Sequence, residues 1–323
     1  EEKKELAHKG GGGFIVKLFH AFCYCAVDVF VMATGYIMCR REFKYIRIFR
    51  LWLQVAGYSL LLLAVARLNG YGIELRDVTN AVMPITTNRY WFFTQYFALF
   101  FTIPFLNKLM GSLSDKEVAV LSITGFSLFS VLPIVAGRDL FVTKWGYSYI
   151  WFTYLYCLGT MLFRLDIVNC VKISRAFVGL GLGCVFSALG AIGSVLLPKL
   201  IGGGGRVGDF AYSYTSPSLI LEAVSLFALI GRIRFACDGM CSKTIAYLAP
   251  STFIVYVIHS NGVFRKMLRW DSVFLPVAQL GVAGVILGTA ACAIVVVLSI
   301  VAIDVARRLA WETMKRHIYG RAN

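Results

Sequence analysis

Asp28 is the most informative chemical group in this chain, because apolar residues surround it for about three positions on each side. Inserting a charged side chain into the middle of a bilayer helix costs roughly 3 kcal/mol, so such a residue needs a partner inside the protein. Two interpretations are open: a residue of a functional site, or a structural aspartate that pairs with an arginine or a backbone amide.

Arg47 and Arg50 are the second candidate group. A helix places residues at positions i and i+3 on one face, so these two guanidinium groups would point the same way. Their planar forks suit phosphate groups. The same pair also fits a positive anchor that contacts lipid head groups where the cytoplasm meets a crossing.

Four histidines could supply a base, since a neutral imidazole can accept a proton from a hydroxyl at about pH 7. His259 ends an apolar stretch, and His8 precedes the glycine run 10–13. His20 fits a packed or snorkelling side chain, and His317 fits a solvated one. The sequence has no His-Glu-x-x-His, Gly-x-Ser-x-Gly or Walker pattern, so it does not favour a soluble-type hydrolase or a nucleotide hydrolase.

The nine cysteines do not indicate a metal centre. The spacings Cys23-x-Cys25 and Cys237-x-x-x-Cys241 lack the paired arrangement of a zinc site. We therefore expect reduced thiols that pack as small hydrophobic groups, and no metal.

Tyr90 and Trp91 begin an aromatic run, Tyr90-Trp-Phe-Phe93, directly after Arg89. Aromatic residues gather at membrane interfaces because their rings are amphipathic. Aromatic faces also stack on sugar rings, and the sequence does not separate these two roles.

These groups are positioned by nine apolar stretches, most of them about 15 to 25 residues long, between short polar loops. A helical crossing needs about 20 apolar residues, and lipid offers the backbone no hydrogen-bond partners, so the stretches must be helices. Hydrophobic residues make up 59% of the chain and mean hydropathy is +0.73. The sequence therefore predicts an all-α polytopic membrane protein, a helical bundle. The nine crossings are expected at about 18–39, 49–66, 90–110, 118–136, 149–163, 176–197, 217–231, 244–259 and 277–303.

The net charge of +15 fits topology and contact with membrane lipids better than nucleic acid, which is not an expected partner. With residues 40–48 in the cytoplasm, 18 of the 32 lysines and arginines lie on the cytoplasmic side and 14 on the outer side. Basic residues favour the cytoplasmic face, so this orientation is predicted. Residues 304–323 are then expected to form a basic amphipathic tail on the inner leaflet.

Five blocks, in order over about 250 residues, resemble the acyltransferase-3 family of bacterial membrane O-acyltransferases. Ala26-Val-Asp-Val-Phe-Val-Met-Ala-Thr-Gly-Tyr36 is similar to the family's small-Val-Asp-Leu-Phe-Phe-Val-Leu-Ser-Gly-Tyr block, with Thr34 where Ser is usual. Arg47-x-x-Arg50 resembles the family's cytoplasmic Arg-x-x-Arg. The remaining blocks are the aromatic run from Tyr90 to Leu109, Gly146-Tyr-Ser-x-x-Trp151 with the Tyr-x-Leu-Gly pattern at 156–159, and Leu248-Ala-Pro-Ser-Thr-Phe-Ile-Val-Tyr-Val-Ile-His259.

The resemblance implies a ten-helix domain that moves an acyl group, commonly acetyl from acetyl-CoA on the cytoplasmic side, to a hydroxyl of a surface or lipid-linked polysaccharide. It implies a histidine that acts as general base or carries the acyl group, oriented by the aspartate, with the second outer histidine as an alternative base. The residues expected at the site are His8, Asp28 and His259 for catalysis, Arg47 and Arg50 for the phosphates of acyl-CoA, and Tyr90 and Trp91 for the acceptor.

In the family, the first helix ends in a histidine regarded as catalytic, with an arginine about eleven residues before it. This chain has no such arginine before His8, so we expect that the first crossing is missing from the sequence. The expected divisions are an N-terminal remnant at 1–17, a membrane acyltransferase domain at 18–303 and a tail at 304–323.

The expected protein is a multi-pass acyltransferase of the bacterial plasma membrane. Two alternatives stay open. A glycan-related transporter or flippase would share the intramembrane aspartate and the basic loops, although no internal repeat supports it. An inactive membrane scaffold would fit Thr34 and the missing helix.

Overall fold

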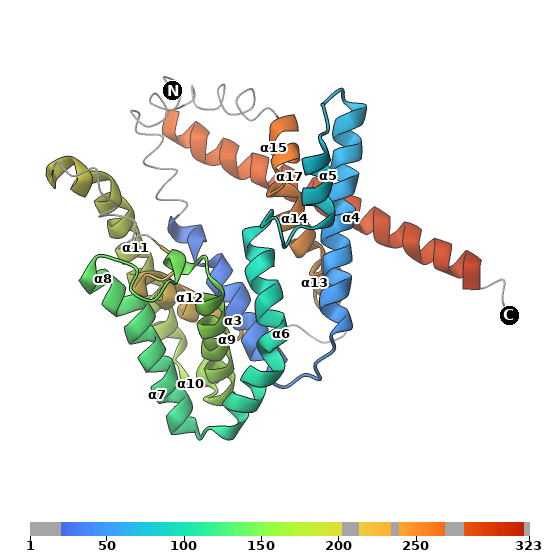
Figure 1. The fold of residues 1–323 in the computed structure, drawn as a ribbon. Coiled ribbons are helices and arrows are strands. Elements are labelled where there is room, and N and C mark those ends of the chain that lie inside the picture. Colours follow the sequence, from blue (N-terminus) through green and yellow to red (C-terminus); the bar gives the residue numbers. More distant parts are fainter. Residues whose placement is uncertain (1–20, 202–212, 234–238, 269–280, 320–323) are drawn as a thin grey trace. The chain divides into compact units, whose positions relative to one another are not determined.

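The computed structural model describes residues 21–201, 213–233, 239–268 and 281–319 (Figure 1). All regular secondary structure in these ranges is helical, as the sequence predicts. The chain divides into two compact units. Unit 1 comprises the described parts of Glu1–Tyr45 and Trp91–Ile233, and unit 2 those of Ile46–Tyr90 and Arg234–Asn323.

The described residues of each of the nine predicted crossings are mainly helical. Six helices in the described ranges are long and apolar enough to cross a membrane. The helices at the third, fifth and seventh predicted crossings are not among them, so the count of nine stays a prediction. The six candidate spans are Ala21–Met38, Ile46–Leu68, Asp115–Ala136, Ile173–Ser194, Met240–His259 and Ala283–His317.

Unit 1 is built around α9 (Tyr149–Arg164), whose side chains are the most buried of the unit. Trp151, Phe152, Leu155 and Tyr156 are fully enclosed. Four helices pack against α9: α3 (Ala26–Met38), α6 (Trp91–Ser112), α7 (Asp115–Phe126) and α10 (Ile167–Cys170). The pair α11 (Ile173–Ile201) and α12 (Pro217–Ile230) completes the unit, with α12 also packed against α3.

Two glycines let α3 and α9 approach until their backbones touch. A Cβ atom on Gly35 would lie 2.1 Å from the carbonyl oxygen of Tyr156, and one on Gly159 would lie 2.0 Å from that of Met32. Only glycine fits at both positions, because such contacts are far inside van der Waals distance. The Thr-Gly-Tyr end of the sequence block at 26–36 therefore has a packing role.

The fourth predicted crossing is not one regular helix. A π-helical turn, Ser127–Val131, joins α7 to α8 (Leu132–Ala136). Pro133 stands at the start of α8, and proline has no N–H to offer the preceding turn. A single wide turn is the usual way for a helix to absorb such an interruption.

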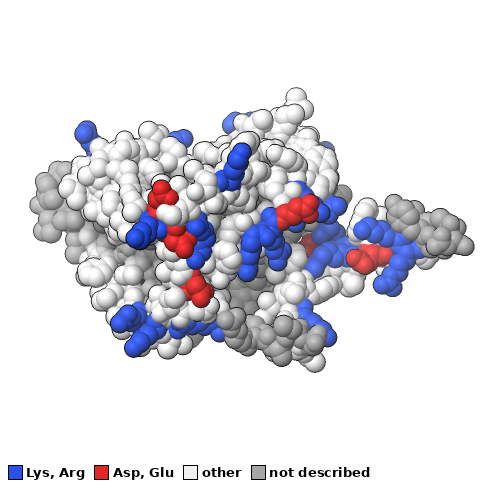
Figure 2. Space-filling view, turned by 90° about the horizontal axis from the view of Figure 1, so that it is seen from below, with Lys and Arg blue, Asp and Glu red and all other residues white. Residues whose placement is uncertain are grey.

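The ends of α6, α9 and α10 and the beginnings of α7 and α11 lie together at the lower end of unit 1 (Figure 1). The sequence assigns the loops at these ends to the cytoplasm. Figure 2 views the molecule from below and shows that basic side chains are more widespread than acidic ones on that face.

In unit 2, α4 (Ile46–Leu68) packs against α5 (Leu75–Val82), α14 (Ser251–His259) and α15 (Gly262–Met267). The eighth predicted crossing is broken: α13 (Met240–Leu248) ends two residues before α14 begins, at Ala249 and Pro250. Ala249 and Pro250 both keep helical backbone angles, but proline has no N–H, so Pro250 cannot donate the helical hydrogen bond to the preceding turn and the ladder is interrupted there.

The last helix, α17 (Gly281–Tyr319), packs against α14 and has 39 residues. At a rise of about 1.5 Å per residue it is about 58 Å long, more than the roughly 30 Å of a hydrocarbon core. Residues 304–319, expected as a separate tail, continue this helix without a break.

Candidate functional site

Asp28 lies in the interior of unit 1 and is completely buried. The indole Nε1 of Trp151 donates a hydrogen bond to its Oδ1 atom over 3.2 Å, while Oδ2 has no hydrogen-bond partner in the part of the chain that the structure describes. Ser148 fixes the donor, because its hydroxyl caps α9 by accepting a hydrogen bond from the backbone N–H of Trp151. The partner of Asp28 is therefore an indole on the central helix of the unit.

Glu222 is a second fully buried carboxyl in unit 1, and it is not among the site residues expected from the sequence. It lies on α12, which packs against α3, the helix that carries Asp28. Gly183 on α11 makes room for it, since a Cβ there would lie 2.6 Å from Cγ of Glu222. The signal that identified Asp28, an acidic residue inside an apolar stretch, is also present at Glu222 and could have found it.

Four rings form what we call the aromatic cluster: Tyr24, Trp91, Tyr147 and Tyr214. Tyr24 stacks on Tyr214 at 4.0 Å between ring centroids, and Trp91 lies 4.5 Å from Tyr147 and 5.7 Å from Tyr214. The hydroxyls of Tyr24 and Tyr147 are 2.8 Å apart. Tyr147 is exposed, so the cluster has an edge that a ligand can reach.

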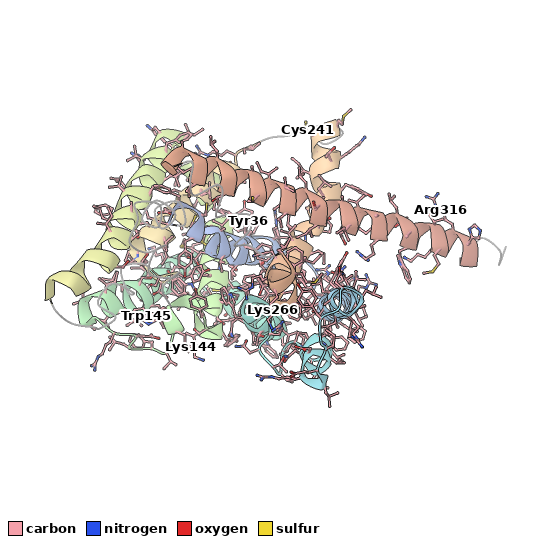
Figure 3. All side chains as sticks on the ribbon, turned by 90° about the horizontal axis from the view of Figure 1, so that it is seen from above. Tyr36, Lys144, Trp145, Cys241, Lys266 and Arg316 are labelled. Atoms are coloured by element: carbon pink, nitrogen blue, oxygen red, sulfur yellow. The ribbon has the colours of Figure 1, made fainter. Side chains whose placement is uncertain are left out.

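Gly146 connects the aromatic cluster to the donor of Asp28. Its φ is +98°, and a Cβ there would lie 2.2 Å from Cβ of Tyr214 and 3.3 Å from Cδ1 of Trp151. The glycine belongs to a short 3-10 turn with Lys144 and Trp145 (Figure 3), which also adopt positive φ. The aromatic cluster and the buried carboxyls are thus parts of one packed region.

Burial holds the phenol of Tyr214 in its neutral form. Removal from solvent raises its pKa, and the neighbouring Tyr147 raises it further. Tyr214 itself is 6% exposed, so the part of the cluster that a ligand can reach is the exposed ring of Tyr147, an aromatic surface that suits a polyol.

Tyr90, next to Trp91 in the sequence, belongs to unit 2 and has a different environment. It is 1% exposed, and its hydroxyl lies 2.8 Å from Oγ of Ser59 and accepts a hydrogen bond of 2.7 Å from Nδ2 of Asn261. These bonds join α4 to the residue that caps α15. Tyr90 thus binds three segments of unit 2 together.

His259 ends α14 and is exposed. Its Nδ1 is 2.8 Å from the carbonyl oxygen of Val255, which requires a proton on that nitrogen. The tautomer assigned from this contact leaves the lone pair on Nε2, 3.4 Å from Oγ of Ser260. The accessible nitrogen is therefore the one that could accept a proton.

Arg47 and Arg50 lie in the first turns of α4, as the spacing predicts. Arg47 is half-buried and Arg50 is exposed. Asp28 and Trp91 belong to unit 1, whereas Arg47, Arg50, Tyr90 and His259 belong to unit 2. His8 lies outside the described residues.

Asp304 on α17 is a third buried acidic residue, 1% exposed, and the sequence did not indicate it. It accepts hydrogen bonds from the Tyr58 hydroxyl (2.6 Å), the Ser251 hydroxyl (2.7 Å) and Nη2 of Arg307 (2.9 Å), and Nε of Arg308 lies 3.2 Å away. The resulting Asp304 network ties α17 to α4 and α14.

A groove of about 330 Å³ beside the Asp304 network is lined by Arg308 and Arg316 together with Glu312. Arg316 lies near the C-terminal end of α17 (Figure 3). Among the described residues, no group of three His, Cys, Asp or Glu side chains stands close enough to hold a metal ion. All cysteines in these ranges are free thiols.

Comparison with known proteins identifies the class to which these features belong. The chain matches the family model described as an acyltransferase domain, acyltransferase-3, over residues 7–304. The chain therefore belongs to the acyltransferase-3 family, and it is a membrane acyltransferase by family and by its apolar helices. No curated protein and no solved structure matches it.

Proposed function

We propose that this protein transfers an acyl group, expected to be acetyl, from acyl-CoA to a hydroxyl of an exported or lipid-linked polysaccharide in the bacterial plasma membrane. The observation that carries the proposal is the packed region of unit 1, where a reachable aromatic cluster adjoins Trp151 and the buried Asp28. This arrangement combines a neutral surface for a sugar ring with an oriented carboxylate, as acyl transfer to a polyol requires.

The transfer forms a bond between the acceptor oxygen and the acyl carbon and breaks the carbon–sulfur bond of the thioester. The proton that leaves the acceptor hydroxyl ends on the thiol of CoA. In this mechanism His8 takes that proton or carries the acyl group, and Asp28 orients the imidazole of His8. His259 is the alternative base. Tyr90 and Trp91 are assigned to the acceptor, Trp91 as a member of the aromatic cluster.

Arg47 and Arg50 are assigned to the phosphates of acyl-CoA. Their place in the first turns of α4 supports this, because one helix face presents two guanidinium forks. A hydrogen bond to a charged group contributes about 1.5–3 kcal/mol, so loss of one arginine should raise the KM for acetyl-CoA by about 10- to 100-fold.

The test uses the full chain in membrane vesicles with radiolabelled acetyl-CoA and the host's polysaccharide, and it measures label in the glycan. Arg47→Ala and Arg50→Ala should raise the KM, and His8→Ala should remove transfer. Arg175→Ala, which removes an exposed arginine at the beginning of α11, is the matched control and should have no effect. If His8→Ala and Arg47→Ala both leave acetylation unchanged, the proposed mechanism is wrong.

A further inference from the structure

Unit 1 contains two enclosed carboxyl groups that have no basic partner in the part of the unit that the structure describes. Asp28 on α3 and Glu222 on α12 are both 0% exposed, on two helices that pack together. Three of their four carboxyl oxygens, Oδ2 of Asp28 and both oxygens of Glu222, have no hydrogen-bond partner within the described ranges. Buried polar atoms of this kind are rare in native proteins and need an explanation.

The groups that face the pair are neutral. Ser187 on α11 and Cys25, the residue before the first turn of α3, lie beside Glu222, and Trp151 on α9 lies beside Asp28. Within the described residues, no lysine, arginine or histidine interacts with either carboxyl. The remaining titratable neighbours that interact electrostatically with one of the two carboxyls are Tyr154, Cys184 and Tyr214.

Two ionised carboxylates would repel each other strongly in this environment. The repulsion is large because the interior of a helical membrane unit has a low effective dielectric constant. An ionised carboxylate without a partner is already costly at this depth. Like-charged carboxyls that share a buried site resolve this conflict by retaining one proton between them.

We propose that Asp28 and Glu222 form a membrane-embedded proton site in which Glu222 holds the proton and Asp28 the negative charge at neutral pH. The assignment follows from the hydrogen bonds. The indole N–H of Trp151 donates a hydrogen bond to Asp28 and stabilises its ionised form. The Ser187 hydroxyl and the Cys25 thiol lie beside Glu222, but neither of its oxygens accepts a hydrogen bond of normal geometry among the described residues.

The role of this site in catalysis rests on the proposed function. The ionised Asp28 has room for one more proton, so the pair can receive from His8 the proton that His8 takes from the acceptor hydroxyl. The pair is then neutral until that proton leaves with the thiol of CoA. Each cycle thus takes up one proton and releases one proton. Glu222 acts as a positioning residue, because its own proton keeps the total charge of the pair at minus one between cycles.

The experiment measures protonation without requiring activity. Dicyclohexylcarbodiimide adds to a protonated carboxyl in an apolar environment and leaves a stable N-acylurea on that residue. The full chain in membranes is treated at neutral pH, digested and analysed by mass spectrometry. We expect modification of Glu222 to exceed that of Asp28 by at least about tenfold, and to decrease as the pH is raised.

Two variants check the assignment. Glu222→Gln should remove the label from α12, whereas Glu117→Gln, which changes an exposed glutamate of the same unit, should leave it unchanged. Trp151→Phe removes the donor to Asp28, so labelling of Asp28 should rise. The wild-type comparison decides the question even if Glu222→Gln does not fold.

Modification of Asp28 in place of Glu222, or of neither residue, overturns the proposal. The proposal is also overturned if sodium ions, but not choline, protect the two carboxyls from modification, since the pair would then bind a metal cation. Expected labelling without any acetylated glycan would leave the proton site in place and refute the proposed function. Acetylated glycan without labelling of Glu222 would refute the proton site and leave the proposed function in place.

Discussion

The Asp304 network allows a quantitative prediction about stability. Asp304 is 1% exposed and accepts hydrogen bonds from Tyr58, Ser251 and Arg307, with Arg308 within ion-pair distance. Asp304→Asn keeps the size of the side chain but removes its charge and replaces one acceptor atom with a donor. At least one hydroxyl or guanidinium group would then face an N–H and lose its acceptor.

The expected loss follows from the exposure of the partners. Removing one member of a buried ion pair costs about 3–5 kcal/mol, because the other charge stays uncompensated. The side chains of Arg307 and Arg308 are 41% and 21% exposed, so solvent compensates part of this loss. We therefore expect destabilisation of about 3 kcal/mol, at the lower end of that range, which corresponds to a melting temperature lower by about 6–12 °C.

The purified full chain is heated to a series of temperatures, and size-exclusion chromatography measures how much of the monodisperse peak remains after each. The temperature at which half of the peak is lost is the melting temperature. Glu312→Gln is the control, because it removes an exposed negative charge from the same helix and should change the stability by less than about 0.5 kcal/mol. Tyr58→Phe removes one hydrogen bond and should cost about 1 kcal/mol. If Asp304→Asn is no less stable than Glu312→Gln, the network does not hold α17 in place.

Three further predictions concern the site and the topology. Trp151→Phe removes the donor to Asp28, so glycan acetylation should fall by about 10- to 100-fold, the equivalent of one charged hydrogen bond, and unchanged activity would contradict this role. Gly159→Ala places a methyl group 2.0 Å from a carbonyl oxygen of α3, so the melting temperature should fall by several degrees. Gly57→Ala is the control, because a methyl group there meets nothing within 4 Å and should not change the melting temperature. Cys170 and Cys241, both exposed and predicted to be cytoplasmic, should react with an impermeant maleimide only after intact cells are permeabilised, and labelling in intact cells would reverse the predicted orientation.

The helical elements were predictable because lipid leaves the backbone no alternative to helix in long apolar stretches. Their interruptions depended on single residues whose effect is local. Pro250 breaks the eighth stretch and Pro133 accompanies a π-helical turn in the fourth. Both prolines are visible in the sequence, but hydropathy averages over windows too long to register them.

The site residues were harder to predict, because burial and pairing are tertiary properties. Asp304 stands one residue beyond the predicted end of the last crossing, so hydropathy places it in the tail. Arg307 and Arg308 at i+3 and i+4 were a local signal of pairing. Its other partners, Tyr58 and Ser251, are 246 and 53 positions away, so no local pattern could indicate them.

Adjacent residues can also belong to different parts of a fold. Tyr90 and Trp91 formed one aromatic motif in the sequence, yet they fall in unit 2 and unit 1, respectively. Trp91 joins the aromatic cluster, whereas the Tyr90 hydroxyl contacts Ser59 and Asn261. Composition does not change between positions 90 and 91, so it carries no sign of the boundary between the units.

The central claim is that these helices carry acyl transfer from a thioester to a sugar hydroxyl. The most direct measurement follows CoA thiol release and ester formation together, in vesicles that contain the full chain, acetyl-CoA and the polysaccharide. We predict one ester for each thiol released and loss of both products in Asp28→Asn, with Glu117→Gln unaffected. Thiol release without ester, or an Asp28→Asn variant that forms ester at the wild-type rate, would contradict the claim.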